Sequence, residues 1–260
     1  MKETVLITGA SSGIGLELAK CFAADQSNLI LVARNTPALE KLAAELRAQH
    51  SIEAHVITAD LSQSDAAQKI FDELKGRGMV VDVLVNNAGF GLHGSFAELP
   101  LLRQLEMIQV NVTALIALTG LFLPGMMARK RGGILNVGSI AGFFPGPNMA
   151  VYYASKAFVL SFSEALHEEL RGTGVSVTNI CPGPTESNFS ATARGYHIRK
   201  KSAGKMSAAV VAQIGYADFR GDKCLSVTGW KNKLLTGIGT TLLPRSVARK
   251  LIKKYNKLKK

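Results

Sequence analysis

The chain has 260 residues, of which 47% are hydrophobic and 19% are charged. A chain of this length and composition forms one globular domain with a sizeable core, which excludes a disordered or coiled-coil protein. The net charge of +12 is uneven, because residues 1–193 carry 14 Lys/Arg and 17 Asp/Glu, whereas residues 194–260 carry 17 and 2.

The N-terminal segment reaches Gly9 after an apolar run that is too short for the apolar region of a signal peptide. The longest apolar stretch, residues 112–127, contains polar residues and Pro124 and falls short of the roughly 20 residues that a membrane-spanning helix needs. Three widely spaced cysteines form neither a metal-ligand nor a disulfide pattern. We therefore expect a cytoplasmic protein in which residues 112–127 form a buried helix.

Short apolar runs alternate with helical patterns from residue 4 onward. Residues 4–8 end at a glycine turn, after which Leu16, Leu18 and Phe22 recur at helical spacing. Further strands are expected at 29–32, 55–58, 80–85, 133–137 and 175–180, and further helices at 37–49, 110–127 and 152–170. Such alternation is typical of parallel strands joined by right-handed crossovers. The sequence predicts a single α/β domain over 1–260, a Rossmann-type doubly wound parallel sheet with helices on both faces.

An unusual residue or cluster follows the end of each expected strand. Sheets of this type bind ligands in a crevice outside the carboxyl ends of their strands. We therefore expect the clusters to face one crevice. They are residues 9–15, Arg34, Asp60, residues 86–89, Ser139 and residues 182–183.

The glycine turn before the first helix is typical of dinucleotide binding. Small residues let the backbone approach a pyrophosphate, and the free N–H groups at a helix N-terminus favour its negative charge. The turn lacks the Gly-Lys-Ser/Thr ending of a phosphate-transfer loop. The predicted cofactor contacts here are Gly9, Ser11, Ser12, Gly13, Ile14 and Gly15.

The end of the second expected strand indicates the type of cofactor. An NAD site places a carboxylate there for the ribose hydroxyls, whereas an NADP site replaces it with a cation for the 2′-phosphate. This strand ends in Ala33, Arg34 and Asn35, without an acid. The sequence therefore favours NADP, bound as NADPH, over NAD. The alternative for Arg34 is a solvated surface side chain.

An ordered set of motifs over residues 3–190 resembles the short-chain dehydrogenase/reductase family. The motifs are residues 8–15, residues 86–89, Asn111, residues 138–139, residues 152–156 and residues 182–183. The resemblance implies an oxidoreductase that moves a hydride between a nicotinamide cofactor and a carbonyl or secondary alcohol. It also implies a homodimer or homotetramer that packs through the helices containing Asn111 and Tyr152.

The resemblance further implies roles for individual residues. Asp60 and Leu61 would lie against the adenine ring, and Asn111 would help to hold a water of a proton relay. Taken alone, Asp60 fits a turn residue and Asn111 a polar helix residue equally well. The cofactor would also contact Asn87, Ala88, Gly89, Pro182 and Gly183.

The family often places a threonine four residues after the glycine of the Pro-Gly motif, where it contacts the carboxamide of the cofactor. In this chain Ser187 occupies that position, and Thr185 is a second candidate. The carboxamide contact is therefore left open between Thr185 and Ser187.

Tyr152 and Lys156 are four residues apart, so they share one face of the expected helix. We predict that Tyr152 is the general acid in carbonyl reduction and the base in alcohol oxidation, with its pKa lowered by the Lys156 ammonium and the oxidised nicotinamide. Lys156 would also bind the nicotinamide ribose. Ser139 would donate a hydrogen bond to the substrate oxygen. The alternative for the pair is an ordinary helix with a core tyrosine and a solvated lysine.

Apolar residues between Ser139 and Tyr152 indicate a substrate with an apolar body, although they could equally pack under a lid. They are Ile140, Phe143, Phe144, Pro145, Pro147, Met149 and Val151.

No cluster with metal-ligand spacing is present in the sequence, and no residue pattern around His93 suggests a catalytic role. The function expected is an NADPH-dependent oxidoreductase. A nucleotide-binding regulatory protein is the alternative, and the combination of Ser139, Tyr152 and Lys156 argues against it.

The region after residue 187 divides into two parts. The apolar residues between about 188 and 230 show no clear helical or strand periodicity, so we expect a substrate-binding lid made of a loop and short helices. Residues of about 231–260 form a basic amphipathic extension with 10 Lys/Arg and no acid. It could contact an anionic membrane surface peripherally, or dock on its own domain or a partner subunit. Nucleic-acid binding is not expected, because no aromatic stacking pattern accompanies the charge.

Overall fold

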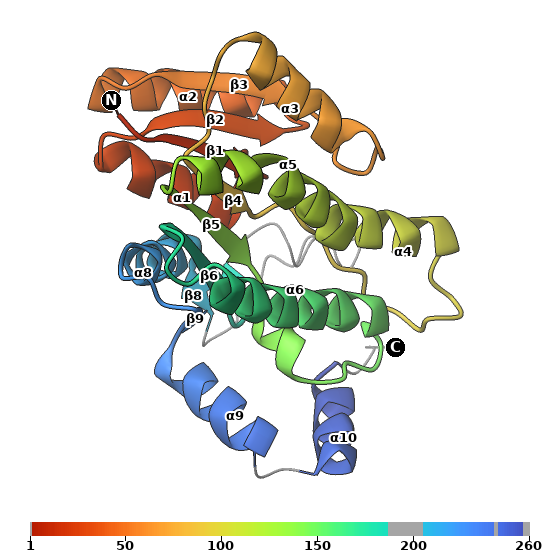
Figure 1. Ribbon diagram of the computed structural model, residues 1–260. Coiled ribbons are helices and arrows are strands. Elements are labelled where there is room, and N and C mark those ends of the chain that lie inside the picture. The colour runs from red at the N-terminus through yellow and green to blue at the C-terminus, as the bar shows by residue number, and fades with distance from the viewer. Residues whose placement is uncertain (1, 187–204, 242–243, 257–260) are drawn as a thin grey trace.

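The computed structural model describes residues 2–186, 205–241 and 244–256 (Figure 1). Seven parallel strands form one sheet in the order β3-β2-β1-β4-β5-β6-β9. Their bounds are β1 (Thr4–Thr8), β2 (Asn28–Ala33), β3 (Ala54–Thr58), β4 (Val83–Asn86), β5 (Gly132–Val137), β6 (Val175–Cys181) and β9 (Leu225–Val227). The order reverses between β1 and β4, which places a crevice at the carboxyl ends of these central strands. The predicted doubly wound parallel sheet is confirmed.

Helices cover both faces of the sheet, as Figure 1 shows. On one face lie α1 (Gly13–Ala24), α2 (Thr36–His50) and α8 (Ala208–Arg220). On the other lie α3 (Ala66–Gly76), α5 (Ala114–Ala128) and α6 (Ala150–Glu169). Alternate strand residues enter the two cores: Val5 and Ile7 of β1 face α1, whereas Leu6 faces the opposite side. This period of two fixes which face each helix covers.

The helix expected at 110–127 is longer than predicted. It begins with α4 (Leu101–Ile108), passes through one π-helical turn (Gln109–Thr113) and continues as α5. By length and composition alone, Leu101–Ala128 could span a membrane, but 39% of its most apolar window is buried inside the protein. A core helix passes the same test, and α5 buries Leu115, Leu118 and Phe122.

Part of the segment predicted as loop and short helices is regular structure. Residues 208–220 form α8, and residues 225–227 form the edge strand β9 beside β6. The cause is packing: the Phe22 ring of α1 contacts Tyr216 at 4.9 Å and Phe219 at 6.0 Å, measured between ring centroids. The two short strands β7 (Thr185–Glu186) and β8 (Met206–Ser207) pair with each other. The remaining part of the predicted lid, residues 188–204, lies outside the described residues.

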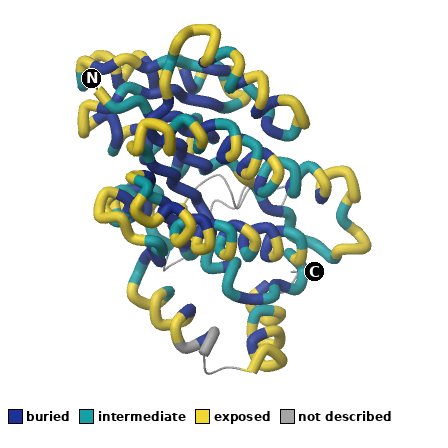
Figure 2. Tube along the Cα trace, in the orientation of Figure 1, coloured by how far each residue is buried: buried dark blue, intermediate teal, exposed yellow. Residues whose placement is uncertain are grey.

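The basic extension forms two helices, α9 (Trp230–Thr241) and α10 (Arg245–Tyr255). Figure 1 shows both at one end of the molecule, beyond the edge of the sheet. Ala248, Ile252 and Asn256 contact the domain, while much of the remaining surface of both helices is exposed (Figure 2). The expectation that the extension docks on its own domain is thus met for one face of α10.

Candidate active site

The turn between β1 and α1 forms a backbone cradle. Gly9 (φ +67°) and Gly13 (φ +60°) adopt left-handed conformations that favour glycine. A Cβ on Gly15 would lie 2.5 Å from the Gly9 carbonyl oxygen and closer still to the Asn87 amide. The Ser12 hydroxyl, at the N-cap of α1, makes no capping hydrogen bond. The first-turn N–H groups are therefore left for another acceptor, and the cradle fits the pyrophosphate of a dinucleotide.

The side chain that closes this cradle comes from the loop after β4. Asn87 Nδ2 donates to the Thr8 carbonyl at 2.8 Å and to the Gly9 carbonyl at 3.2 Å. The Thr8 hydroxyl in turn accepts from the backbone N–H groups of Asn87 and Ala88, both at 3.0 Å. Thr8 belongs to the glycine-turn motif in the sequence, but it was not predicted as a site residue.

Arg34 and Asp60 follow the neighbouring strands β2 and β3. Arg34 is exposed, Asp60 is half-buried, and Leu61 is buried. Burial alone would raise the pKa of Asp60, but hydrogen bonds from Ser62 and the positive charges of Arg34 and Arg103 outweigh it and lower the pKa. An ionised Asp60 therefore lies near Arg34 at the crevice. Arg103, which also stacks over the Phe90 ring at 5.1 Å, was not predicted.

Tyr152 and Ser139 meet at the carboxyl end of β5. The two side chains are hydrogen-bonded, and Tyr152 is only 8% exposed. Ser139 Oγ also lies 3.4 Å from the Pro182 carbonyl, to which it donates, and accepts from the Ala141 N–H at 3.1 Å. Burial raises the pKa of Tyr152 to about 12, although the bond to Ser139 opposes the shift.

Lys156 lies one turn after Tyr152 on the same helix and is buried. Its Nζ donates to the Val137 carbonyl at 2.7 Å, and burial lowers its pKa to about 8. Lys156 is not among the groups that shift the pKa of Tyr152 here, and the predicted lowering by Lys156 together with the oxidised nicotinamide stays a prediction. Desolvation of the phenol dominates its titration, and Lys156 is bonded to the end of β5.

Asn111 sits in the π-helical turn between α4 and α5. Its Oδ1 accepts from the Phe90 N–H at 3.1 Å, and its Nδ2 donates to the Phe90 carbonyl and to Ser155 Oγ, both at 3.0 Å. Because α6 carries Ser155, this amide joins the loop after β4 to the helix that holds Tyr152. π-Helical turns are frequent at functional sites. The predicted role in holding a water stays a prediction.

The Pro-Gly motif follows β6 at the same edge of the sheet. Gly183 lies against Asn232 of α9, because a Cβ on Gly183 would overlap the Asn232 amide. The Thr185 hydroxyl donates to the Gly183 carbonyl at 2.9 Å. Ser187, the other candidate for the carboxamide contact, lies outside the described residues. Asn232 is a neighbour of the motif that sequence reasoning missed.

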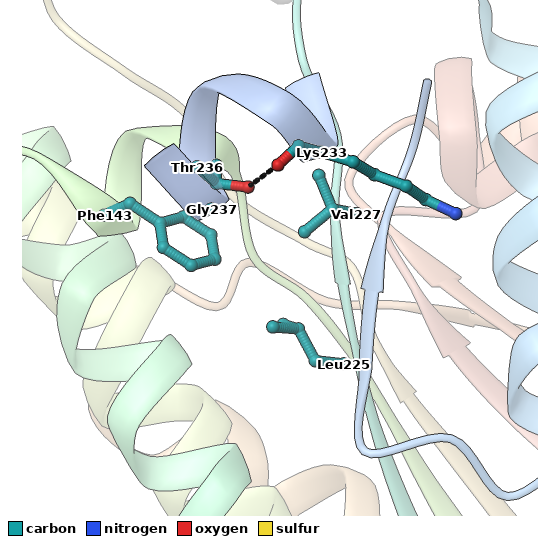
Figure 3. Close-up of a pocket in the computed structure, with 6 residues that line it drawn as sticks. All are labelled: Phe143, Leu225, Val227, Lys233, Thr236 and Gly237. Atoms are coloured by element: carbon teal, nitrogen blue, oxygen red, sulfur yellow. Dashed lines mark hydrogen bonds between the residues drawn. The ribbon is translucent and has the colours of Figure 1, made fainter. Parts of the chain in front are cut away.

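Two cavities flank the segment that follows Ser139, and Phe143 borders both. The smaller, of about 300 Å³, lies between Phe143, β9 and α9. Figure 3 shows the Phe143 ring and the Leu225 and Val227 side chains around it, with the Lys233 amine directed away from Phe143. The larger, of about 450 Å³, is bordered by Phe143, Phe144, Pro145, Pro147, Tyr153, Arg245 and Arg249, among others. Part of the predicted apolar rim therefore lines a cavity.

Comparison with known proteins places this site in a family. The family model for short chain dehydrogenases matches residues 3–196. Sulfoacetaldehyde reductase 2 of Chromohalobacter salexigens is 39% identical over 197 residues, which cover 75% of this chain and 77% of the relative. A very-long-chain 3-oxoacyl-CoA reductase of Rattus norvegicus is 31% identical over 264 residues, 98% of this chain and 80% of the relative.

A solved structure shows the same architecture. A short-chain dehydrogenase from Sphingobium yanoikuyae, in complex with NADPH, aligns with a TM-score of 0.82 and 31% identity, covering 92% of this chain and 94% of that one. The motifs at the strand ends, the fold and the residues matched by the family model all indicate the same family. The chain belongs to the short-chain dehydrogenase family of oxidoreductases, which act on carbonyl and alcohol groups.

Proposed function

We propose that the chain is an NADPH-dependent reductase of ketones or aldehydes, with Ser139, Tyr152 and Lys156 as its catalytic residues. The observation that carries the proposal is the buried Tyr152 phenol, hydrogen-bonded to Ser139 at the end of β5. A regulatory protein that only binds the nucleotide would have no need of a buried, oriented phenol beside the glycine cradle.

The protein supplies proton transfer and charge stabilisation in this proposal. A bound nicotinamide dinucleotide supplies the hydride. Tyr152 Oη gives its proton to the substrate oxygen as negative charge develops there, and the Ser139 hydroxyl donates a second hydrogen bond to that oxygen. Burial raises the pKa of Tyr152 to about 12, so the phenol is protonated at neutral pH, the form that a proton donor needs. Lys156, with its pKa lowered to about 8, would hold the nicotinamide ribose.

The proposed cofactor contacts follow the strand ends: the glycine cradle for the pyrophosphate, Arg34 for the 2′-phosphate, and Asp60 and Leu61 for the adenine. The loop residues Asn87, Ala88 and Gly89 and the motif Pro182–Gly183 would line the nicotinamide half. An exposed arginine directly after β2, with no acid at that strand end, supports NADPH over NADH.

The test of this function is nucleotide consumption with a panel of carbonyl compounds. The panel contains aldehydes, methyl ketones and 3-oxoacyl-CoA thioesters of increasing chain length, together with sulfoacetaldehyde. We expect turnover with NADPH to exceed turnover with NADH, and kcat/KM to rise with chain length, because apolar side chains occupy the segment between Ser139 and Tyr152. Nucleotide binding without turnover of any compound would favour the regulatory alternative.

Replacing Arg34 with alanine is the control for the cofactor preference. Hydrogen bonds from an arginine to a phosphate contribute about 1.5–3 kcal/mol, so we expect NADPH affinity to fall roughly 10- to 100-fold. The affinity for NADH, which has no 2′-phosphate, should stay unchanged. Equal losses for both nucleotides, measured by fluorescence titration, would show that Arg34 does not read the 2′-phosphate.

We also propose peripheral contact with an anionic membrane through α9 and α10. Val247, Leu251 and Tyr255 lie on one face of α10, and Leu251 and Tyr255 are 54% and 69% exposed. On α9, Trp230 is 71% exposed. Basic residues flank these side chains, and residues 231–260 contain no acid. Two copies of such a surface would repel each other, whereas anionic headgroups would attract it. The proposed location is cytoplasmic, at a membrane surface.

Vesicle co-sedimentation tests this surface. We expect binding to vesicles that contain phosphatidylserine, weaker binding at high salt, and little binding to phosphatidylcholine vesicles. Leu251→Glu should weaken the binding strongly, because it places an acid between the apolar face and the lipid. Val80→Glu, at another exposed apolar position, is the matched control. Equal binding by both variants would exclude α10 as the contact.

Other exposed apolar side chains, on α4, α5 and α6, support the proposed homodimer or homotetramer. Leu102 and Leu105 on α4, Ile116 on α5 and Phe158 on α6 are all exposed. Phe158 stacks on Phe162 at 5.6 Å on the same helix. These helices contain or adjoin Asn111 and Tyr152, as the family resemblance implied.

A further inference from the structure

The C-terminal end of α10 is attached to the segment that leads into Tyr152. Asn256 follows the last residue of α10 and is only 4% exposed, although it lies just after a helix whose outer face is solvated. Its Nδ2 donates to the Pro147 carbonyl at 3.2 Å and lies 3.2 Å from the Tyr153 hydroxyl, while its Oδ1 lies 3.5 Å from that hydroxyl. One side chain thus joins α10 both to the loop before α6 and to α6 itself.

The backbone of Asn256 adds two further connections. Its carbonyl accepts from Asn148 Nδ2 at 2.9 Å and from His93 Nε2 at 3.2 Å. Asn148 is connected on its other side, because its own carbonyl accepts from the Gly94 N–H at 2.9 Å. The end of α10 therefore fastens together the loop that follows Gly89 and the loop that precedes Tyr152.

Asn148 adopts a conformation that needs such support. Its φ of +65° lies in the left-handed region, which is uncommon for residues other than glycine and is found at sites held by their surroundings. Met149 and Ala150 follow, and α6 begins at Ala150. The path of the chain at Asn148 therefore determines where the first turn of α6, and with it Tyr152, is placed.

The side chains that pack beside the contact between Asn256 and Tyr153 include the proposed catalytic residue Tyr152. The rings of Tyr152 and Tyr153 meet edge to face at 6.1 Å between centroids. Ala248 and Ile252, about two turns and one turn before Asn256, pack in the cluster that contains Phe144 and both tyrosines. Tyr153 therefore contacts both Asn256, at the end of α10, and Tyr152.

We propose that Asn256 and Asn148 are positioning residues, a latch through which α10 holds the substrate side of the active site in register with Tyr152. The nucleotide cradle does not depend on this latch, since Gly9 and Arg34 directly follow β1 and β2 and Gly15 lies in the first turn of α1. The latch acts on carbonyl reduction and not on NADPH binding.

Two variants remove the latch by different routes. Asn256→Asp keeps the size and the acceptor of the side chain but removes the N–H donated to Pro147. Asn148→Gly removes the bond to the Asn256 carbonyl, and glycine adopts a φ of +65° without strain. Ser246→Ala, at an exposed position of α10 outside the latch, is the matched control.

The kinetic test uses the full chain, NADPH and the best compound of the carbonyl panel, and it rests on the proposed reductase function. Because small misplacements of reacting groups are costly, we expect kcat/KM to fall roughly 10- to 100-fold in both latch variants, with the affinity for NADPH unchanged. Wild-type kinetics in both variants, or a loss of NADPH affinity that parallels the loss of turnover, would overturn the positioning role.

Amide hydrogen exchange tests the latch without relying on activity. We expect faster exchange over residues 91–95 and 144–150 in Asn256→Asp and Asn148→Gly, with exchange over residues 4–15 unchanged. Unaltered exchange over 91–95 and 144–150 in both variants would contradict the latch even if the reductase function holds. Faster exchange in a protein that reduces no carbonyl compound would support the latch and count against the proposed function.

Discussion

Replacing Tyr152 with phenylalanine is expected to lower kcat/KM for carbonyl reduction roughly 10²- to 10⁴-fold, the range that a positioned acid contributes. Phenylalanine fills the same buried space but has no proton to give and no hydroxyl for Ser139. NADPH affinity should stay close to that of the wild type, because the glycine cradle and Arg34 are not altered. Steady-state kinetics and a fluorescence titration of NADPH measure the two quantities separately.

The neighbouring tyrosine provides the comparison. Tyr153→Phe removes the hydroxyl that meets Asn256 but leaves the proposed acid in place, so its loss of activity should be much smaller. Equal losses in the two variants would contradict the assignment of the acid to Tyr152. The pH profile is a second criterion: with its pKa near 12, Tyr152 supports reduction below that pH, and this support is lost as pH rises through about 12.

Replacing Gly15 with alanine is expected to abolish measurable NADPH binding and to destabilise the fold. The added Cβ would lie 2.5 Å from the Gly9 carbonyl oxygen, and it would displace the Asn87 amide that bridges Thr8 and Gly9. Because the nearest atoms belong to the backbone, the turn itself must move. Overpacking of this kind costs about 1–3 kcal/mol, which thermal unfolding can detect.

A second helical glycine separates this clash from a general effect of alanine. Gly120 of α5 is exposed, and outside its neighbours and the backbone of its own helix no atom lies within 4 Å of the place where its Cβ would be. Gly120→Ala should therefore leave NADPH binding unchanged and stabilise the protein by about 0.4–1 kcal/mol. If Gly15→Ala bound NADPH as well as Gly120→Ala, the turn between β1 and α1 would not be the pyrophosphate site.

Six of the seven strands could be predicted because parallel strands buried on both faces appear as short apolar runs between turn residues. The seventh strand, β9, has only three residues and pairs with the far end of β6, so its sequence carries no pattern of its own. Helix α8 was predicted only as short helices of unspecified position, although Val211, Ala212, Gly215 and Phe219 are buried at helical spacing. The glycines and polar residues around it masked that signal.

The candidate site was predictable wherever the topology alone determines position. The cradle, Arg34, Asp60, Ser139 and the Pro-Gly motif all follow strand ends, so the order of strands brings them together. The direction of the Tyr152 pKa was not predictable, because desolvation depends on the packing of Phe144, Tyr153 and α10 around the phenol. Asn256 was not predictable either, since no local pattern reports a contact between residues 108 positions apart.

The all-parallel sheet also has a consequence for how the chain folds. No two neighbouring strands of the described sheet are joined by a hairpin, and β1 must pair with β4, in which Val5 meets Val83, before the central strands are complete. Contacts so distant in sequence form slowly, because a long loop must close before they stabilise the chain. The Thr8 hydroxyl, at the end of β1, donates to the Val85 carbonyl of β4 and accepts from the Asn87 N–H just after β4. The glycine cradle is therefore finished only when β1 and β4 meet, and a ligand that binds only the finished cradle would stabilise the native state by mass action.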